Sequence, residues 1–290
     1  MAPASGTKKT GKKGMKARRA QQVATRNWIL GALGVVVAGV LTLGILGVNP
    51  FIASNPTPTH LANGKWLRSL SLVTHPGAAG TMPALLPPAK QVKNAPSFLY
   101  IGGEYCPYCA ASRWAMVIAL SRFGRFTHLG TMRSSSTDIY PDTPTWTFYK
   151  DNYQSQYLSV KTIEGWTRQG PTSPLEPITE PYLSIFERLD APPLVPTTQD
   201  SGSIPFIVIG GKYVWIGSLY NPKRLEGVGW QTIIQSVKTN QGPMGPAINA
   251  NANVLTAALC TTDGNRPGSV CDTPTIKGLE AKLKALPIAP

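Results

Sequence analysis

Acidic residues are scarce in this 290-residue chain, and the first of them, Glu104, comes only after a third of the sequence. Lys and Arg together number 28 against 14 Asp and Glu, a formal net charge of +14. Eight of the cations stand in residues 1–27, which leaves 14 − 8 = +6 for the remainder. The shortage of acids therefore marks off a basic N-terminal tail rather than a uniformly basic protein.

Histidine and cysteine are also few, three and four respectively, which argues against a structural zinc site. Such a site needs four Cys or His ligands, usually in two closely spaced pairs. Cys106 and Cys109 form one close pair, but Cys260 and Cys271 have ten residues between them. The histidines are scattered at His60, His75 and His128. We therefore expect no metal and no cofactor, with zinc binding or a static disulfide as alternative uses of the close pair.

The close cysteine pair lies where a predicted strand passes into a predicted helix. Residues 98–101 are an apolar run that indicates a buried strand, and residues 110–123 carry apolar side chains at roughly helical spacing. Pro107, between the cysteines, suits the first turn of a helix. Cys106 then falls at the helix N-terminus, where the N–H groups and the macrodipole lower the pKa of a thiol. We therefore expect Cys106 to be the exposed attacking thiolate and Cys109 the buried resolving thiol.

Residues 28–48 are 21 residues without a charge, and about 20 apolar residues suffice to cross a bilayer. The alternative is a cleaved signal peptide, whose apolar region would be about 7–15 residues long and followed by a better cleavage site than residues 49–55. Lys and Arg stay on the cytoplasmic side. We expect a single-pass membrane protein with a cytoplasmic tail (1–27) and an extracytoplasmic domain, where disulfides are permitted. The alternative, that the tail binds nucleic acid, is weaker, and we expect no such partner.

The rest of the chain shows no internal repeat. Residues 49–90 are rich in proline and predict a linker with a possible first strand at 65–73. Further strands are predicted at 125–132, 145–149 and 157–163, the last two as a hairpin around Asp151 and Asn152, and helices at 178–189 with Thr179 as cap, 230–237, 247–259 and 277–286.

A second informative stretch is residues 202–217, where Gly210-Gly211-Lys212 joins two short apolar runs and predicts a tight β-hairpin. The order strand, Cys-Pro-Tyr-Cys, helix, Ile204-Pro205, hairpin and final helix resembles the thioredoxin superfamily. The resemblance implies that Cys106, Cys109 and Pro205 carry the chemistry, with a cis bond before Pro205, and that Pro107, Tyr108 and Ile204 contact the substrate. Pro205 in trans at the start of an edge strand is the alternative.

The resemblance implies an α/β, thioredoxin-like fold in residues 91–240, which would follow the single transmembrane helix expected at 28–48. Because 95 residues separate Cys109 from Pro205, we expect an insertion at 133–200, and we expect a C-terminal helical extension at 241–290. The whole layout is similar to a membrane-anchored family called domain of unknown function 929, whose name implies no activity.

One position departs from the thioredoxin pattern. Thioredoxins often carry a buried acid six residues before the first cysteine, and Tyr100 stands there in this chain. The nearest acid is Glu104, at an offset where a glutamate is common beside the motif, and a plain surface position is the alternative for it. The departure leaves open which group helps to deprotonate Cys109.

The leading hypothesis is a thiol–disulfide oxidoreductase that acts on protein thiols and disulfides. Work as an oxidase or isomerase is favoured, since a reductase would need electrons delivered across the membrane. A redox recycling partner is implied but not identified. The alternative is a non-catalytic, membrane-tethered adaptor with a fixed disulfide. In that case the aromatic residues of 133–200 would form a partner surface, although they suit a core equally well.

Cys260 and Cys271 flank residues 261–270, whose Gly and Pro give little helix or strand propensity. We expect a structural disulfide there, contributing roughly 3 kcal/mol in the chain-entropy model. Free thiols or a second redox pair are the alternatives. The redox alternative is weaker because Cys260 follows the helix predicted at 247–259, and a helix C-terminus disfavours a thiolate.

Overall fold

The computed structural model describes residues 80–290. The predicted basic tail, the apolar run at 28–48 and the possible strand at 65–73 lie outside the described residues. Within residues 80–290, none of the helices has the length and hydropathy needed to span a bilayer.

The described chain contains both strands and helices, and every element after the last strand is helical. The strands are β1 (Ala84–Leu85), β2 (Phe98–Gly103), β3 (Arg125–Arg133), β4 (Pro144–Gln154), β5 (Val160–Trp166), β6 (Phe206–Ile209) and β7 (Tyr213–Ile216). The α-helices are α4 (Pro107–Leu120), α5 (Tyr182–Leu189), α6 (Trp230–Thr239), α7 (Gly245–Thr262), α8 (Gly268–Cys271) and α9 (Pro274–Lys284), and the 3-10 turns are η2 (Pro88–Lys90), η3 (Thr198–Asp200) and η4 (Pro222–Leu225).

The centre of the fold is a five-stranded mixed sheet with the order β1-β7-β6-β2-β5. Strand β2 pairs in parallel with β5 and antiparallel with β6, and β6 forms a hairpin with β7. Gly210 and Gly211, in the hairpin turn, have φ values of 55° and 65°, a conformation that glycine adopts at little cost. The predicted hairpin is confirmed, and the arrangement is consistent with a thioredoxin-like α/β fold.

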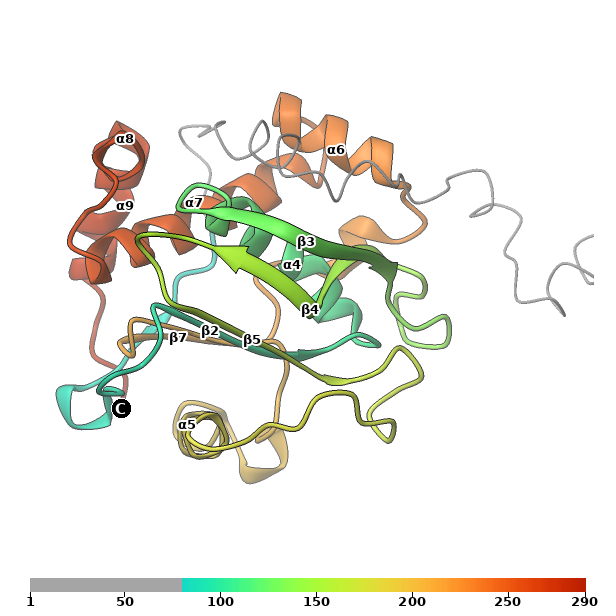
Figure 1. The fold of residues 1–290 in the computed structure, drawn as a ribbon, viewed down its shortest axis with the longest axis horizontal. Helices are drawn as coiled ribbons and strands as arrows, with labels where there is room; N and C mark the ends of the chain where they lie inside the picture. The colour runs from blue at the N-terminus through green and yellow to red at the C-terminus, as the bar shows by residue number, and fades with distance from the viewer. Residues whose placement is uncertain (1–79) are drawn as a thin grey trace, which may run out of the picture. The chain divides into compact units, whose positions relative to one another are not determined.

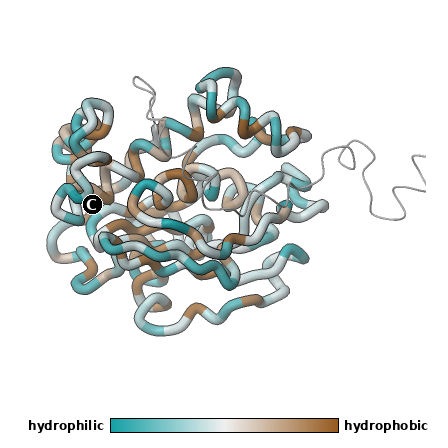
Figure 2. Tube along the Cα trace, turned by 45° about the horizontal axis from the view of Figure 1, so that its top comes forward, coloured by the Kyte–Doolittle hydropathy of each residue, from teal (hydrophilic) through white to brown (hydrophobic). Residues whose placement is uncertain are grey.

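Alternate side chains of β2 enter two different hydrophobic layers, as the two-residue period of a strand requires. Phe98 and Tyr100 belong to a large cluster with α4 and α7, whereas Leu99 and Ile101 belong to a smaller cluster with α5. Figure 1 shows α4 and α7 on one side of the sheet and α5 on the other, and Figure 2 shows hydrophobic segments concentrated between these layers. Burial on both faces explains why β2 reads as a continuous apolar run.

Helix α4, which carries the cysteine motif, is buried on every side except at Tyr108. A helix that is apolar all round belongs in a core. Helix α7 packs against it, and the indole of Trp114 lies 4.3 Å from that of Trp146 and 5.1 Å from that of Trp230, measured between ring centroids. The segment predicted as a C-terminal extension thus supplies α7 to the main core.

Strands β3 and β4 form a second, two-stranded antiparallel sheet. The predicted hairpin between 145–149 and 157–163 is therefore wrong. Strand β4 runs straight through Asp151 and Asn152, the expected turn, and β5 joins β2 instead. The physical reason is burial: Ile163 of β5 is 2% exposed in the main sheet, and that packing outweighs a weak local turn signal.

The insertion at 133–200 stays a prediction. Within that segment, β5 belongs to the main sheet and α5 covers its second face, whereas β4 pairs with β3 in the second sheet.

The predicted helix boundaries agree with the structure to within three residues for α4, α6, α7 and α9. Helix α5 differs: it begins at Tyr182, its N-cap is Pro181, and no side chain caps it. The expectation that Thr179 caps it is wrong, although the backbone carbonyl of Thr179 accepts the N–H of Tyr182 at 2.9 Å. A residue before proline is disfavoured in the helical conformation, which delays the start of the helix beyond Glu180.

Candidate functional site

Cys106 is the N-cap residue of α4, and its sulfur accepts a hydrogen bond from the backbone N–H of Cys109 at 3.3 Å. Pro107 follows at the first helical position, where its missing N–H leaves no donor unsatisfied. The pKa of the Cys106 thiol is lowered, first by a side-chain hydrogen bond from Cys109 and further by backbone N–H groups and the charge of Arg113, although burial opposes the shift. The predicted strand-to-helix placement of the motif is confirmed.

The pKa of Cys109 moves the other way. It is raised well above its usual value, first by burial and then by the sulfur of Cys106, while Arg113 and the backbone of Gly103 lower it. The two neighbouring thiols therefore differ in acidity, which is the asymmetry that an attacking and a resolving thiol need.

Cys106 is less accessible than the sequence analysis expected. It is 5% exposed, against 0% for Cys109, so the expectation of an openly exposed thiolate is wrong in degree. The segment before β6 explains the difference, because the Cys106 sulfur lies 3.9 Å from the carbonyl oxygen of Ile204, to which it can donate.

The Ile204–Pro205 bond is cis, and Pro205 is buried at the start of β6. A Cβ atom placed on Gly103 would lie 2.9 Å from the ring of Tyr105 and 3.4 Å from the Cδ1 atom of Ile204. The glycine therefore makes room for the Tyr105 ring, and Ile204 lies within van der Waals reach of the end of β2. The three segments that the sequence analysis singled out, at 98–103, 106–109 and 204–205, meet at one place.

An exposed apolar surface adjoins the cysteines. Tyr108 is 37% exposed and Ile139 62% exposed, and Tyr108 makes an edge contact with the ring of Tyr140 at 6.1 Å between centroids. The loop that carries Ile139 is tied to the motif because Ser135 donates its N–H to the carbonyl of Tyr105 at 2.9 Å. Of the residues predicted to contact substrate, Tyr108 lies on this surface and Ile204 is half-buried, whereas Pro107 is buried.

The sequence analysis missed a buried ion pair beneath the cysteines. Arg113 of α4 and Glu164 of β5 are both 0% exposed, and they are joined at 2.6 Å (Nη2 to Oε2) and 2.8 Å (Nε to Oε1). Arg113 also donates to the carbonyl of Gly103 at 2.9 Å. One signal was available: an arginine four residues after Cys109, in a helix that is otherwise almost entirely apolar.

Glu104 lies near the site, and its carboxylate binds a residue of β4. It is half-buried, and its Oε1 accepts the hydroxyl of Thr147 at 2.7 Å, which joins the end of β2 to β4. Tyr100 occupies the position of the thioredoxin acid; it is fully buried, and its hydroxyl lies 3.4 Å from Glu164.

Cys260 and Cys271 are joined by a disulfide, with their Cα atoms 5.6 Å apart. Cys260 lies in the last turn of α7, and Cys271 ends α8, a short helix where the sequence analysis expected loop. That expectation is wrong because Pro267, despite a low helix propensity, can precede a helical turn. A Cβ on Gly210 would touch Thr262, so this disulfide lies towards the hairpin turn, at the opposite end of β6 from Pro205.

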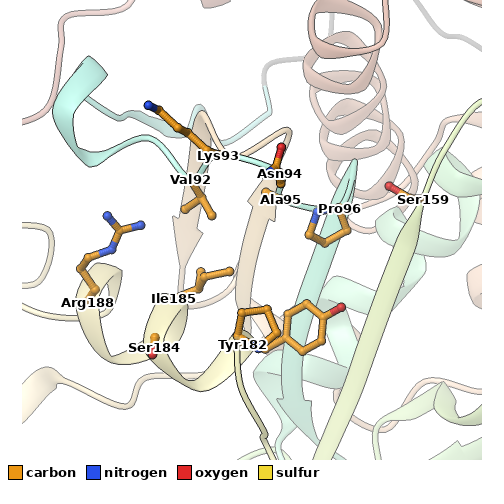
Figure 3. Close-up of a pocket in the computed structure, with 11 residues that line it drawn as sticks. Val92, Lys93, Asn94, Ala95, Pro96, Ser159, Tyr182, Ser184, Ile185 and Arg188 are labelled. Atoms are coloured by element: carbon orange, nitrogen blue, oxygen red, sulfur yellow. The ribbon is translucent and has the colours of Figure 1, made fainter.

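A pocket of about 480 Å³ lies between residues 92–96 and α5. Figure 3 shows Lys93 and Arg188 at one end of it and Pro96 and Tyr182 at the other. Pro96 precedes β2, so this pocket is at the opposite end of that strand from the cysteine pair. Within residues 80–290 no group of three or more His, Cys, Asp or Glu side chains is arranged to hold a metal ion.

Comparison with known proteins gives one match. Residues 89–177 match the family model described as Domain of unknown function (DUF929). The matched segment contains both cysteines of the motif together with Arg113 and Glu164, but ends before Pro205. No curated protein and no solved structure is significantly similar to the chain.

Proposed function

We propose that this protein is a thiol–disulfide oxidoreductase in which Cys106 attacks and Cys109 resolves. One observation carries the proposal: Cys106 caps α4 and accepts a hydrogen bond from the N–H of Cys109, so that neighbouring thiols have opposite pKa shifts. A fixed structural bridge has no need of such a difference.

The exchange needs no other redox group. The Cys106 thiolate attacks one sulfur of a substrate disulfide, forms a mixed disulfide and releases the first substrate thiolate. Cys109 then loses its proton, and its thiolate attacks the Cys106 sulfur, forming the Cys106–Cys109 disulfide and releasing the second substrate thiolate. The substrate gains two electrons and the protein loses two; oxidation of a substrate dithiol is the same sequence reversed.

A polypeptide is the substrate class that best suits the surroundings of Cys106. Tyr108 and Ile139 offer exposed apolar surface for side chains next to the target cysteine, and the carbonyl oxygen of Ile204 lies 3.9 Å from the Cys106 sulfur. A small thiol would gain nothing from a surface of this kind.

The proposed location is extracytoplasmic, with the chain held to the membrane by residues 28–48 and a basic tail on the cytoplasmic side. The charge pattern of residues 1–48 supports it. In this location the protein would work as an oxidase or isomerase and be returned to its starting state by a separate redox partner. Membrane association that persists after deletion of residues 1–48 would refute the anchor.

The test is the reduction potential of the Cys106–Cys109 pair, measured by equilibrating the full-length protein with glutathione redox buffers. An oxidase or isomerase should give a value between about −120 and −230 mV. A value below about −300 mV, the range of inert structural bridges, would favour the adaptor alternative instead. The control is the Cys260→Ala/Cys271→Ala variant, which should titrate at the same potential as the parent.

A further inference from the structure

The resolving step poses a physical problem. Cys109 is 0% exposed, and a thiolate in an apolar interior is costly unless a positive charge or hydrogen-bond donors compensate it. Thioredoxins often place a carboxylate nearby to help move the proton, but Tyr100 fills that position here.

Both oxygens of Glu164 are engaged in hydrogen bonds. Its Oε1 accepts from Arg113 Nε and from the N–H of Phe148 at 3.2 Å, and its Oε2 accepts from Arg113 Nη2 and faces the hydroxyl of Tyr100. Four donors therefore surround its two oxygens and fix the carboxylate against Arg113. These donors favour the charged carboxylate, whereas burial favours the neutral form and leaves the pKa of Glu164 raised.

Arg113 is placed to act on the cysteines directly. It follows Cys109 by four residues in α4, which puts the two on the same helix face. The carbonyl of Gly103 accepts both Arg113 Nη2 at 2.9 Å and the N–H of Cys106 at 3.3 Å. The guanidinium thus shares a hydrogen-bond acceptor with the cysteine loop.

One donor nitrogen of the Arg113 guanidinium is unpaired within the described part of the chain. Its Nη1 atom is buried and has no hydrogen-bond partner among residues 80–290, although the arginine is 0% exposed. A buried ion pair does not by itself imply a gain in stability, because desolvation offsets the attraction. The pair therefore invites a functional explanation.

We propose that Arg113 is a positioning residue of the redox site: its guanidinium, held in place by Glu164, is the fixed positive charge against which the Cys109 thiolate forms during resolution. This inference rests on the proposed function, because it assigns the resolving role to Cys109. It implies that the proton of Cys109 need not pass to a carboxylate. The positive charge lowers the energy of the Cys109 thiolate, and water or the departing substrate thiolate takes the proton.

The experiment measures the pKa of Cys109 by thiolate absorbance in full-length protein carrying Cys106→Ser, so that one thiol of the motif titrates. Two variants change the charges near Cys109 in different ways: one removes the partner of Arg113, and the other removes the whole ion pair. Glu164→Gln keeps the shape and leaves the arginine uncompensated, so Cys109 should become about tenfold more acidic, or about one pKa unit. Arg113→Met/Glu164→Leu removes both charges without leaving one buried alone, and should make Cys109 about tenfold less acidic.

A purely structural role would lower the stability of both variants without moving the thiol pKa in opposite directions. The proposal would be overturned if the pKa of Cys109 moved in the same direction in both variants. It would also be overturned if that pKa did not move in a variant shown to be folded by circular dichroism. Arg113→Lys keeps the charge and should retain more than half of the parental effect on Cys109. If the opposite shifts appear while the parent protein exchanges no disulfides, the charge assignment stands and the proposed oxidoreductase function fails.

With Cys106 restored, the same variants should change the lifetime of the mixed disulfide. Arg113→Met/Glu164→Leu should resolve it about three- to fourfold more slowly than the parent at pH 7, since the tenfold loss of ionised Cys109 is partly offset by the greater nucleophilicity of a thiolate of higher pKa. An unchanged rate would contradict the assignment.

Discussion

The two cysteine pairs of this protein are equally well buried and differ in the helix end that each occupies. All four cysteines are 5% exposed or less. Cys106 precedes the first turn of α4, whereas Cys260 lies in the last turn of α7. A helix N-terminus stabilises a thiolate, and a C-terminus destabilises it. Within this fold, the local field rather than accessibility distinguishes the pair that we propose to be reactive from the disulfide-bonded pair.

The largest expected effect comes from removing the attacking thiol. Cys106→Ser should lower disulfide exchange by about 10³-fold or more, as loss of a nucleophile usually does. Cys109→Ser should keep the first attack and accumulate the mixed disulfide, detectable by non-reducing electrophoresis with a model protein substrate. Cys260→Ala/Cys271→Ala should retain exchange, and its loss in this folded control would break the distinction between the pairs.

Removing the Cys260–Cys271 pair should lower the stability of the protein more than removing the Cys106–Cys109 pair. Cys260→Ala/Cys271→Ala should lower the free energy of unfolding by about 2–5 kcal/mol, because the bridge restricts the unfolded chain. Denaturant titration at constant pH measures this change. Cys106→Ala/Cys109→Ala, which removes no bridge present in the reduced protein, is the matched control and should cost less. A larger loss in the control would reverse the assignment of structural and reactive roles.

A pH effect on stability is expected from a buried carboxyl near the first pair. Asp190, 1% exposed at the end of α5, has its pKa raised to about 6 by burial, against smaller opposing effects of the Ser203 and Gly202 backbone, just before Ile204. The folded state therefore binds this proton more tightly than the unfolded state, and the free energy of unfolding should fall as the pH rises from about 4 to about 6.

Asp190→Asn should reduce that fall and be more stable than the parent at pH 7 by about 1–2 kcal/mol. Part of the fall should remain, because burial also raises the pKa of Asp151 to about 6. Chemical denaturation at a series of pH values measures the fall. The control is Glu187→Gln, an exposed position on the same helix, which should follow the parental curve. An Asn variant that loses as much stability as the parent over this pH range would show that Asp190 does not contribute.

The smallest effect concerns the surface beside Cys106. Ile139→Ser should raise KM for a polypeptide substrate a few-fold with kcat unchanged, since the exposed side chain contributes only to binding. Ile288→Ser is the matched control, because Ile288 is 59% exposed, close to the 62% of Ile139, but lies beside β1. Equal changes in both variants would remove the evidence that this surface binds substrate.

Much of the site could be predicted because its signals are local. The strand, the two glycines, Cys-Pro-Tyr-Cys and the following helix lie within residues 98–120, where neighbouring residues fix the placement of Cys106. The Ile204-Pro205 segment was found through a family resemblance rather than through local physics.

The ion pair could not be predicted in the same way. Arg113 and Glu164 are 51 residues apart, and they meet only because Glu164 stands opposite Gly102 in the β2–β5 register. A sequence pattern shows that a strand exists but does not state its partner. The same limit produced the wrong hairpin between β4 and β5.

The edges of the main sheet have a consequence for behaviour in concentrated solution. An open strand edge is a template for pairing with another molecule. On the outer side of β1, Leu85 bridges to Ile288 and accepts the N–H of Ala289 at 2.8 Å, and beyond β5 Trp166 bridges to Pro174. At these residues the chain caps its own sheet on both sides. Folded molecules are thereby hindered from joining edge to edge into extended β-structure, a hazard that returns if residues 288–289 are displaced.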